Sequence, residues 1–174
     1  MEHLTKNQLQ AVLAEAKKAS QRDWLMLVLG YVHGLRISEV CALTPGNFKS
    51  AGHLTVQRLK GSMRTTQPLI ESENELLNEK AAIEAWIKAF SVRQRIFGIQ
   101  RSMLSKLFEK YARLAGVPAH LRHFHVLKHS IAMHGIHTGI ENVRQYLGHK
   151  SISSTGIYLQ VDDAQASEAV QSAL

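Results

Sequence analysis

The chain has 174 residues, of which 45% are hydrophobic and 20% are charged, close to the averages for globular proteins. This length fits a single domain with its own core, and the composition excludes extended disorder and collagen-like repeats. Lys and Arg number 21 against 14 Asp and Glu, which gives a net charge of +7. The positive charge favours an anionic partner such as nucleic acid.

The cysteine content and the first residues indicate the cellular compartment in which the protein is expected. Cys41 is the only cysteine, so no internal disulfide can form and nothing indicates an oxidising compartment. Residues 1–6 lack the apolar segment of a signal peptide, and no apolar run approaches the roughly 18 residues of a membrane span. We therefore expect a cytoplasmic protein with no membrane partner.

Three helices are predicted in the first 43 residues. Thr5 and Gln8 form a capping-box pattern before apolar residues at helical spacing: Leu9, Val12, Leu13 and Ala16. Ser20 and Asp23 predict a second helix in the same way, which runs toward Gly34. A short third helix is expected over 37–43, before Thr44-Pro45-Gly46.

The middle of the chain mixes strands and helices. Residues 53–57 and 66–70 alternate in polarity, which predicts an antiparallel hairpin with a basic, glycine-bearing loop at 60–65. A helix is expected over 74–90, and its inner face has five apolar residues: Leu76, Leu77, Ile83, Trp86 and Ile87. Another helix is expected over 101–115, before Gly116 and Pro118.

Helices are also expected near 126–137, 142–147 and 153–158. An alanine-rich tail follows from residue 162, with apolar residues at helical spacing. The predicted class is mainly α with a small antiparallel β-sheet (α+β), in a single domain over residues 1–174.

Several basic or phenolic residues stand beside a turn or a helix start rather than in mid-helix: Arg36, Lys60, His125, His149 and Tyr158. Lys128 follows His125 by one helical turn. Each belongs to a longer string: Gly34-Leu35-Arg36-Ile37-Ser38-Glu39-Val40; Leu59-Lys60-Gly61 with Arg64 and Pro68-Leu69; His125-Val126-Leu127-Lys128-His129-Ser130; Leu147-Gly148-His149-Lys150-Ser151-Ile152-Ser153-Ser154-Thr155; and Ile157-Tyr158.

In order and spacing, these strings resemble the tyrosine recombinase and phage integrase family over residues 5 to 170 or so. The resemblance implies the catalytic-domain fold of that family. It also implies a site-specific recombinase that cleaves and rejoins DNA through a 3′-phosphotyrosyl intermediate. The implied roles are Tyr158 as nucleophile, Arg36 and Lys128 as clamps on phosphate oxygens, Lys60 as general acid, His125 in proton transfer or phosphate positioning, and His149 as a hydrogen-bond donor to a non-bridging oxygen.

The residue types fit this chemistry. Phosphoryl transfer places negative charge on equatorial oxygens, which Arg, Lys and His can stabilise without a metal. A covalent bond to Tyr conserves the energy of the broken phosphodiester, so strands can be rejoined without ATP. We therefore expect no cofactor and no small-molecule substrate. His125 and His129 have the spacing of a helical metal pair, but Val126 stands where a zinc hydrolase has a carboxylate, so no metal is expected.

One position departs from the family pattern. The family generally has His-x-x-Arg, whereas this chain has Lys128 in place of the Arg. Lysine keeps the charge but loses the planar fork that grips two oxygens. Two outcomes stay open: an active enzyme with a single charged contact, or a catalytically impaired DNA-binding relative. Strand relaxation like that of a type IB topoisomerase is a further alternative.

The remaining expectations concern DNA and assembly. Glu39 is expected to support Arg36 structurally. Basic side chains outside the catalytic set either contact DNA phosphates or are solvated, with the first three preferred for DNA: Arg64, Arg122, Lys150, Arg58, Arg93 and Arg95. The partner is double-stranded DNA. The resemblance also implies that an N-terminal core-binding domain is absent from this chain. It further implies that the tail helix at 163–174 docks on a neighbouring subunit of a tetramer on DNA, or else packs on its own domain.

Overall fold

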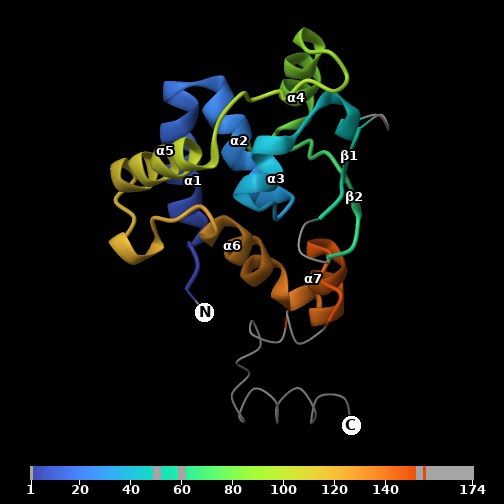
Figure 1. The fold of residues 1–174 in the computed structure, drawn as a ribbon. Helices are drawn as coiled ribbons and strands as arrows, with labels where there is room; N and C mark the ends of the chain where they lie inside the picture. Colours follow the sequence, from blue (N-terminus) through green and yellow to red (C-terminus); the bar gives the residue numbers. More distant parts are fainter. Residues whose placement is uncertain (1, 49–51, 59–61, 152–154, 156–174) are drawn as a thin grey trace.

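The computed structural model describes residues 2–48, 52–58, 62–151 and 155. Within these ranges it contains seven α-helices, short 3-10 turns and one two-stranded antiparallel sheet (Figure 1). The predicted mainly helical class with a small sheet is confirmed. The helix expected near 153–158, apart from Thr155, and the tail at 163–174 lie outside the described residues, as do Lys60 and Tyr158.

Helix α1 (Lys6–Ala19) begins at the predicted capping box. Thr5 Oγ1 accepts a hydrogen bond from the Gln8 amide at 3.2 Å, and Gln8 Oε1 accepts one from the Thr5 amide at 2.9 Å. The four apolar residues expected to face inward are buried. These two reciprocal bonds satisfy donors that would otherwise be free at the helix start.

Helix α2 (Gln21–Val32) is the central helix of the domain, and every residue from Asp23 to Val32 is buried. Helices α1 and α6 pack along it. Its N-terminus differs from the prediction: Ser20 Oγ accepts from the Asp23 amide, but the Asp23 carboxylate does not return to Ser20. That carboxylate instead accepts a hydrogen bond from Tyr111 Oη at 2.6 Å, because Asp23 is buried against α5.

Helix α3 (Ile37–Ala42) and a 3-10 turn, η1 (Pro45–Phe48), lead into the hairpin of β1 (His53–Val56) and β2 (Thr65–Pro68). His53 lies opposite Pro68, and Val56 opposite Thr65. The predicted hairpin is confirmed, although Thr65 belongs to the strand and not to the loop. Figure 1 shows the hairpin on one side of the molecule, with α1 and α5 on the other.

The prediction of a helix over 74–90 is wrong for residues 74–79. Helix α4 spans only Lys80–Trp86, followed by η2 (Ile87–Ala89). The Asn74 side chain accepts from the Leu76 amide, and the carbonyls of Glu75 and Leu76 accept from the side chains of Lys17 and Trp24. Helical hydrogen bonding is therefore replaced by tertiary contacts before residue 80.

The C-terminal part contains α5 (Arg101–Leu114), η3 (Ala119–Leu121), α6 (Val126–Gly135), η4 (Ile136–Thr138) and α7 (Ile140–Leu147). The expected helices at 101–115, 126–137 and 142–147 are confirmed, with small differences at their ends. None of the described helices is long and apolar enough to span a bilayer.

Candidate active site

Arg36 is placed by the tight turn between α2 and α3. Gly34 has φ +58, and a Cβ on it would lie 2.5 Å from Leu147 Cδ2 at the end of α7. Only glycine meets both the positive φ and the close approach. The turn that presents Arg36 is therefore packed directly against the helix that precedes His149.

His149 is placed by the equivalent turn after α7. Gly148 ends the helix with φ +70, and a Cβ on it would lie 2.8 Å from the carbonyl oxygen of Met63. The Met63 amide donates to the Gly148 carbonyl at 2.8 Å. The hairpin loop region and the His149 turn are thus in backbone contact, although they are more than 80 residues apart.

A buried carboxylate holds Arg36. Glu39 accepts from the Arg36 amide at 2.7 Å and from Arg36 Nη1 at 3.2 Å. Glu39 also pairs with Arg58 Nη1 at 3.4 Å, and its side chain is 1% exposed. The Arg36 side chain is 23% exposed, so this guanidinium is anchored at one edge and still reaches the surface.

Arg58 corrects one expectation, since it is neither solvated nor available to DNA. Its side chain is fully buried, and its guanidinium donates to the carbonyls of His33 and Gly34 and to Thr65 Oγ1. Five donors in a fixed fork suit this multiple contact. Arg58 therefore ties the hairpin to the Arg36 turn.

A second buried network joins the same segments. His33 Nδ1 lies 2.9 Å from Gln67 Oε1, and His33 Nε2 lies 2.7 Å from Glu79 Oε1. Gln67 Nε2 donates to the Tyr146 carbonyl at 2.8 Å, which leaves Gln67 Oε1 as the acceptor for His33. The end of α2, strand β2 and α7 are thereby held in one arrangement.

Lys128 lies on α6, one turn after His125, and is 2% exposed. Its Nζ has no hydrogen-bond partner among the described residues. Burial and the positive charges of Arg36 and Arg58 lower the pKa of Lys128 from 10.5 to about 7, against the opposing effect of Glu39. The amine therefore belongs to the same electrostatic cluster as Arg36.

His149 is buried, and its Nδ1 lies 3.0 Å from Thr155 Oγ1. Burial and the surrounding cations, Lys128 first among them, lower the pKa of His149 from 6.5 to about 4. The imidazole is therefore neutral near pH 7. If Thr155 donates to Nδ1, the other ring nitrogen carries the proton and can serve as a donor.

His125 lies at the start of α6 and is exposed, with its ring 4.4 Å from the ring of His129 between centroids. Burial and the nearby charge of His125 lower the pKa of His129 to about 4. The structure thus brings together Arg36, Lys128 and His149, with His125 one turn away on the same helix. Lys60 and Tyr158 were assigned from sequence, and both lie outside the described residues.

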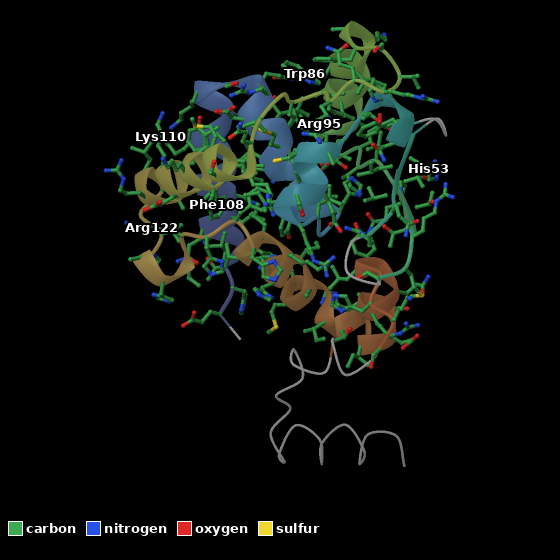
Figure 2. The ribbon with its side chains drawn as sticks, viewed as in Figure 1. His53, Trp86, Arg95, Phe108, Lys110 and Arg122 are labelled. Atoms are coloured by element: carbon green, nitrogen blue, oxygen red, sulfur yellow. The ribbon has the colours of Figure 1, made fainter. Side chains whose placement is uncertain are left out.

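A surface depression of about 760 Å³ begins beside Arg36, between α3 and the start of α5. Its lining includes Ser38, Arg95, Gln100 and Arg101. Figure 2 labels Arg95 beside α3. Sequence reasoning named Arg95 but missed Arg101, although a helix start after a glycine-containing basic segment was an available signal.

The three basic residues preferred for DNA contact are dispersed. Arg64 is exposed before β2, and Lys150 is exposed directly after His149. Arg122 donates to the Val117 carbonyl at 2.7 Å and lies on the opposite side of the molecule from His53 (Figure 2). Arg64 and Lys150 therefore flank the site, whereas Arg122 is remote from the hairpin.

Comparisons with known proteins agree with this arrangement. The sequence profile of the phage integrase family matches residues 2–165. The chain is 31% identical to the tyrosine recombinase XerA of Pyrococcus furiosus over 98% of its own length and 61% of that protein. It is 32% identical to a tyrosine recombinase of Pseudothermotoga lettingae over 93% of its own length and 57% of that protein.

Solved structures share the fold. The catalytic domain of bacteriophage HP1 integrase superposes with a TM-score of 0.68 at 22% identity, covering 98% of this chain and 94% of that one. A XerH site-specific recombinase bound to its difH substrate superposes with a TM-score of 0.74 at 19% identity, covering 97% and 53%. The chain thus spans little more than half the length of the curated relatives named here. With the family profile matched over nearly all of its residues, the chain belongs to the phage integrase family.

Proposed function

We propose that the chain is the catalytic domain of a site-specific DNA recombinase that cleaves and rejoins strands through a 3′-phosphotyrosyl intermediate. The observation that carries the proposal is the convergence of Arg36, Lys128 and His149 from three segments of a phage integrase family chain. The hairpin whose loop contains Lys60 in the sequence is hydrogen-bonded through the Met63 amide to the carbonyl of Gly148, the residue before His149.

The cluster suits one phosphodiester. Arg36 offers a partly exposed guanidinium, Lys128 an amine without an acceptor, and neutral His149 a ring nitrogen. Such preorganised donors stabilise the charge that develops on the equatorial oxygens. In the proposed reaction Tyr158 Oη attacks phosphorus, His125 accepts the phenolic proton, and the bond from phosphorus to the 5′ oxygen breaks. Lys60 protonates that oxygen, and the reverse step reseals a strand.

Double-stranded DNA is the proposed substrate and partner. The basic depression between α3 and α5 starts at Ile37, directly after Arg36, and Arg95 and Arg101 lie on its wall. A DNA backbone that crosses the site can follow this depression. The XerH structure named above contains a bound difH substrate, and a lambda integrase dimer has been solved on a COC′ core site.

We further propose that subunits associate on DNA as a tetramer through the segment 163–174. The support is the family membership together with the sequence pattern of that segment. Size measurement of the protein with and without a bound duplex tests this. A protein that remains monomeric on every duplex it cleaves would contradict it.

Covalent capture tests the enzyme proposal. Nicked suicide duplexes trap the phosphotyrosyl intermediate because the short cleaved fragment diffuses away. A pool with a randomised core removes the need to know the target site in advance. We expect a denaturant-resistant adduct with the wild type and none with Tyr158→Phe.

The matched control is Tyr146→Phe. Tyr146 Oη donates to the Val32 carbonyl at 2.6 Å, and burial raises the pKa of Tyr146 to about 12, so it is a poor nucleophile. Tyr146→Phe should still form the adduct. If Tyr158→Phe forms as much adduct as the wild type, or if no wild-type adduct is selected from the pool, the proposal fails.

The rival reading, a DNA-binding relative with impaired chemistry, is favoured by Lys128 alone. Lys128→Arg restores the fork of the family pattern. Adduct formation by Lys128→Arg but not by the wild type would support the rival. Equal adduct formation by both would show that the lysine already suffices.

A further inference from the structure

Lys128 is the unusual group of this site. Across the described residues, Glu79 Oε2 and Lys128 Nζ are the two buried side-chain atoms that lack a hydrogen-bond partner. Glu79 is still bonded through its other oxygen to His33. Lys128 has no such compensation. A buried ammonium without an acceptor carries a large desolvation cost.

The two arginines that face Lys128 increase that cost: Arg36 from the start of α3 and Arg58 from the segment after β1. The Glu39 carboxylate, also on α3, opposes them. Both arginines already pair with the single carboxylate of Glu39. The carboxylate therefore cannot also neutralise a third cation.

The other groups that interact with Lys128 within the described ranges carry no negative charge. His149, after α7, and His129, on α6 itself, both interact electrostatically with Lys128. On α2, which packs along α6, Tyr31 Oη donates to His134 Nδ1, because His134 Nε2 donates to the Leu4 carbonyl. Figure 1 shows α6 crossing below α3 and ending beside α7.

We propose that above neutral pH Lys128 is a neutral amine in the free protein and becomes an ammonium when a DNA phosphodiester enters the site, so that phosphate binding there takes up a proton from solvent. A non-bridging phosphate oxygen supplies both the acceptor and the negative charge that the free site lacks. In this step one proton from the buffer adds to the Lys128 amine, and no other covalent bond forms or breaks. The inference rests on the proposed function because it assigns the phosphate to the same cluster.

The direction of the pH dependence follows. The pKa of Lys128 in the free site is about 7, because burial and the two arginines disfavour its charged form. An arginine at this position would stay charged at any working pH. The replacement of the family's arginine by Lys128 therefore makes phosphate binding weaken as pH rises above neutrality.

Titration of the free protein tests, independently of DNA, whether the Lys128 amine loses its proton near neutral pH. The Cε and Nζ resonances of Lys128 are identified by their absence in Lys128→Met and followed from about pH 5.5 to 9.5. We expect a transition near pH 7, as the lowered pKa of this group requires. An ammonium that persists to about pH 9 would overturn the inference, whether or not the protein is a recombinase.

Sulfate tests whether a bound anion promotes protonation of Lys128, because sulfate presents phosphate-like oxygens and keeps a fixed charge over this pH range. Added sulfate should move the Lys128 transition to higher pH in the wild type. With Arg36→Gln, which removes a neighbouring clamp, the displacement should shrink. A transition that sulfate does not move would overturn the coupling between the anion and the proton.

The affinity for a DNA duplex should depend on pH for the same reason. Uptake of one proton by a group of pKa about 7 lowers the affinity for DNA roughly 20-fold between about pH 6.5 and about pH 8.5. Lys128→Arg and Lys128→Met should both lose this dependence, with Lys128→Met weaker throughout. The control Lys106→Met, at an exposed site on α5, should keep the wild-type dependence. A wild type as insensitive to pH as Lys128→Arg would overturn the inference, whereas a failed proposed function would show as no duplex binding at any pH.

Discussion

The burial of Lys128 predicts an unusual pH dependence of folding stability in the absence of DNA. The pKa of Lys128 lies near 7 in the folded chain and near 10.5 when the chain is unfolded. Between these values the unfolded state binds more protons, so the free energy of unfolding rises with pH. Below pH 7 both states are protonated, and the full cost of the buried charge is present.

The size of the effect follows from the same two pKa values. A displacement from 10.5 to about 7 corresponds to a cost of roughly 5 kcal/mol when Lys128 is charged in the folded state. Linkage leaves about 5 kcal/mol of this cost at pH 6.5 and about 3 kcal/mol at pH 8.5. Lys128→Met, which keeps a similar length and removes the charge, should therefore stabilise the protein, and by about 2 kcal/mol less at the higher pH.

Urea unfolding of the wild type and of Lys128→Met at several pH values between about 6.5 and about 8.5 measures this difference. The change with pH is the diagnostic quantity, because altered packing by Met adds an offset that does not vary with pH. Lys106→Met is the matched control: Lys106 is exposed on α5, so its variant should differ from the wild type by a constant amount. If the difference between wild type and Lys128→Met is equally constant, the reasoning about Lys128 is refuted.

Three further predictions concern Gly148, Tyr111 and His149. Gly148→Ala should cost more than about 2 kcal/mol of unfolding free energy and abolish adduct formation, because its Cβ would lie 2.8 Å from a carbonyl oxygen. Gly116→Ala has the same φ of +70 with open space around it, so about 1 kcal/mol is expected, and equal costs would contradict the packing argument. Tyr111→Phe removes the hydroxyl that donates to Oδ2 of buried Asp23 at 2.6 Å, while Oδ1 still accepts from Arg22, and should cost about 1 to 3 kcal/mol in urea unfolding; a neutral result would show that Oδ2 does not require this donor. His149 has a pKa of about 4 in the folded chain, below its ordinary 6.5, so its contribution to stability is lost as pH falls through that interval. His149→Gln should therefore make acid unfolding shallower, and an unchanged acid transition would argue against the burial of a neutral imidazole.

Local pattern predicted much of the fold. The capping box at Thr5, the hairpin alternation and the helix ends before Gly34 and Gly148 each depend on neighbouring residues only, and each is found in the structure. The same glycines also have a tertiary role that the sequence did not reveal. Gly34 admits Leu147, and Gly148 admits the Met63 carbonyl. Contacts across such sequence distances depend on how the helices pack, which no local pattern encodes.

Burial of charge was the main feature that sequence could not predict. In the sequence Arg58 resembles any basic residue near a turn, yet its buried guanidinium donates hydrogen bonds to the carbonyls of His33 and Gly34. The helix expected over 74–90 failed for a related reason, since Lys17 and Trp24 bind the carbonyls that helical bonds would need. In both cases a distant polar partner, invisible in the local sequence, outweighed local preference.

These buried charges also explain why the lysine at position 128 is not simply a weakened arginine. Arg36 and Arg58 share the carboxylate of Glu39, so these three described residues together carry one positive charge in excess. A third guanidinium would remain charged there at any working pH, whereas Lys128 can release its proton. On the proposed function, the departure from His-x-x-Arg would lower the cost of assembling the free site and leave the charged form of the lysine to be stabilised by the bound anion. Whether the position favours lysine or arginine therefore depends on the number of buried cations around it and not on the phosphate contact alone.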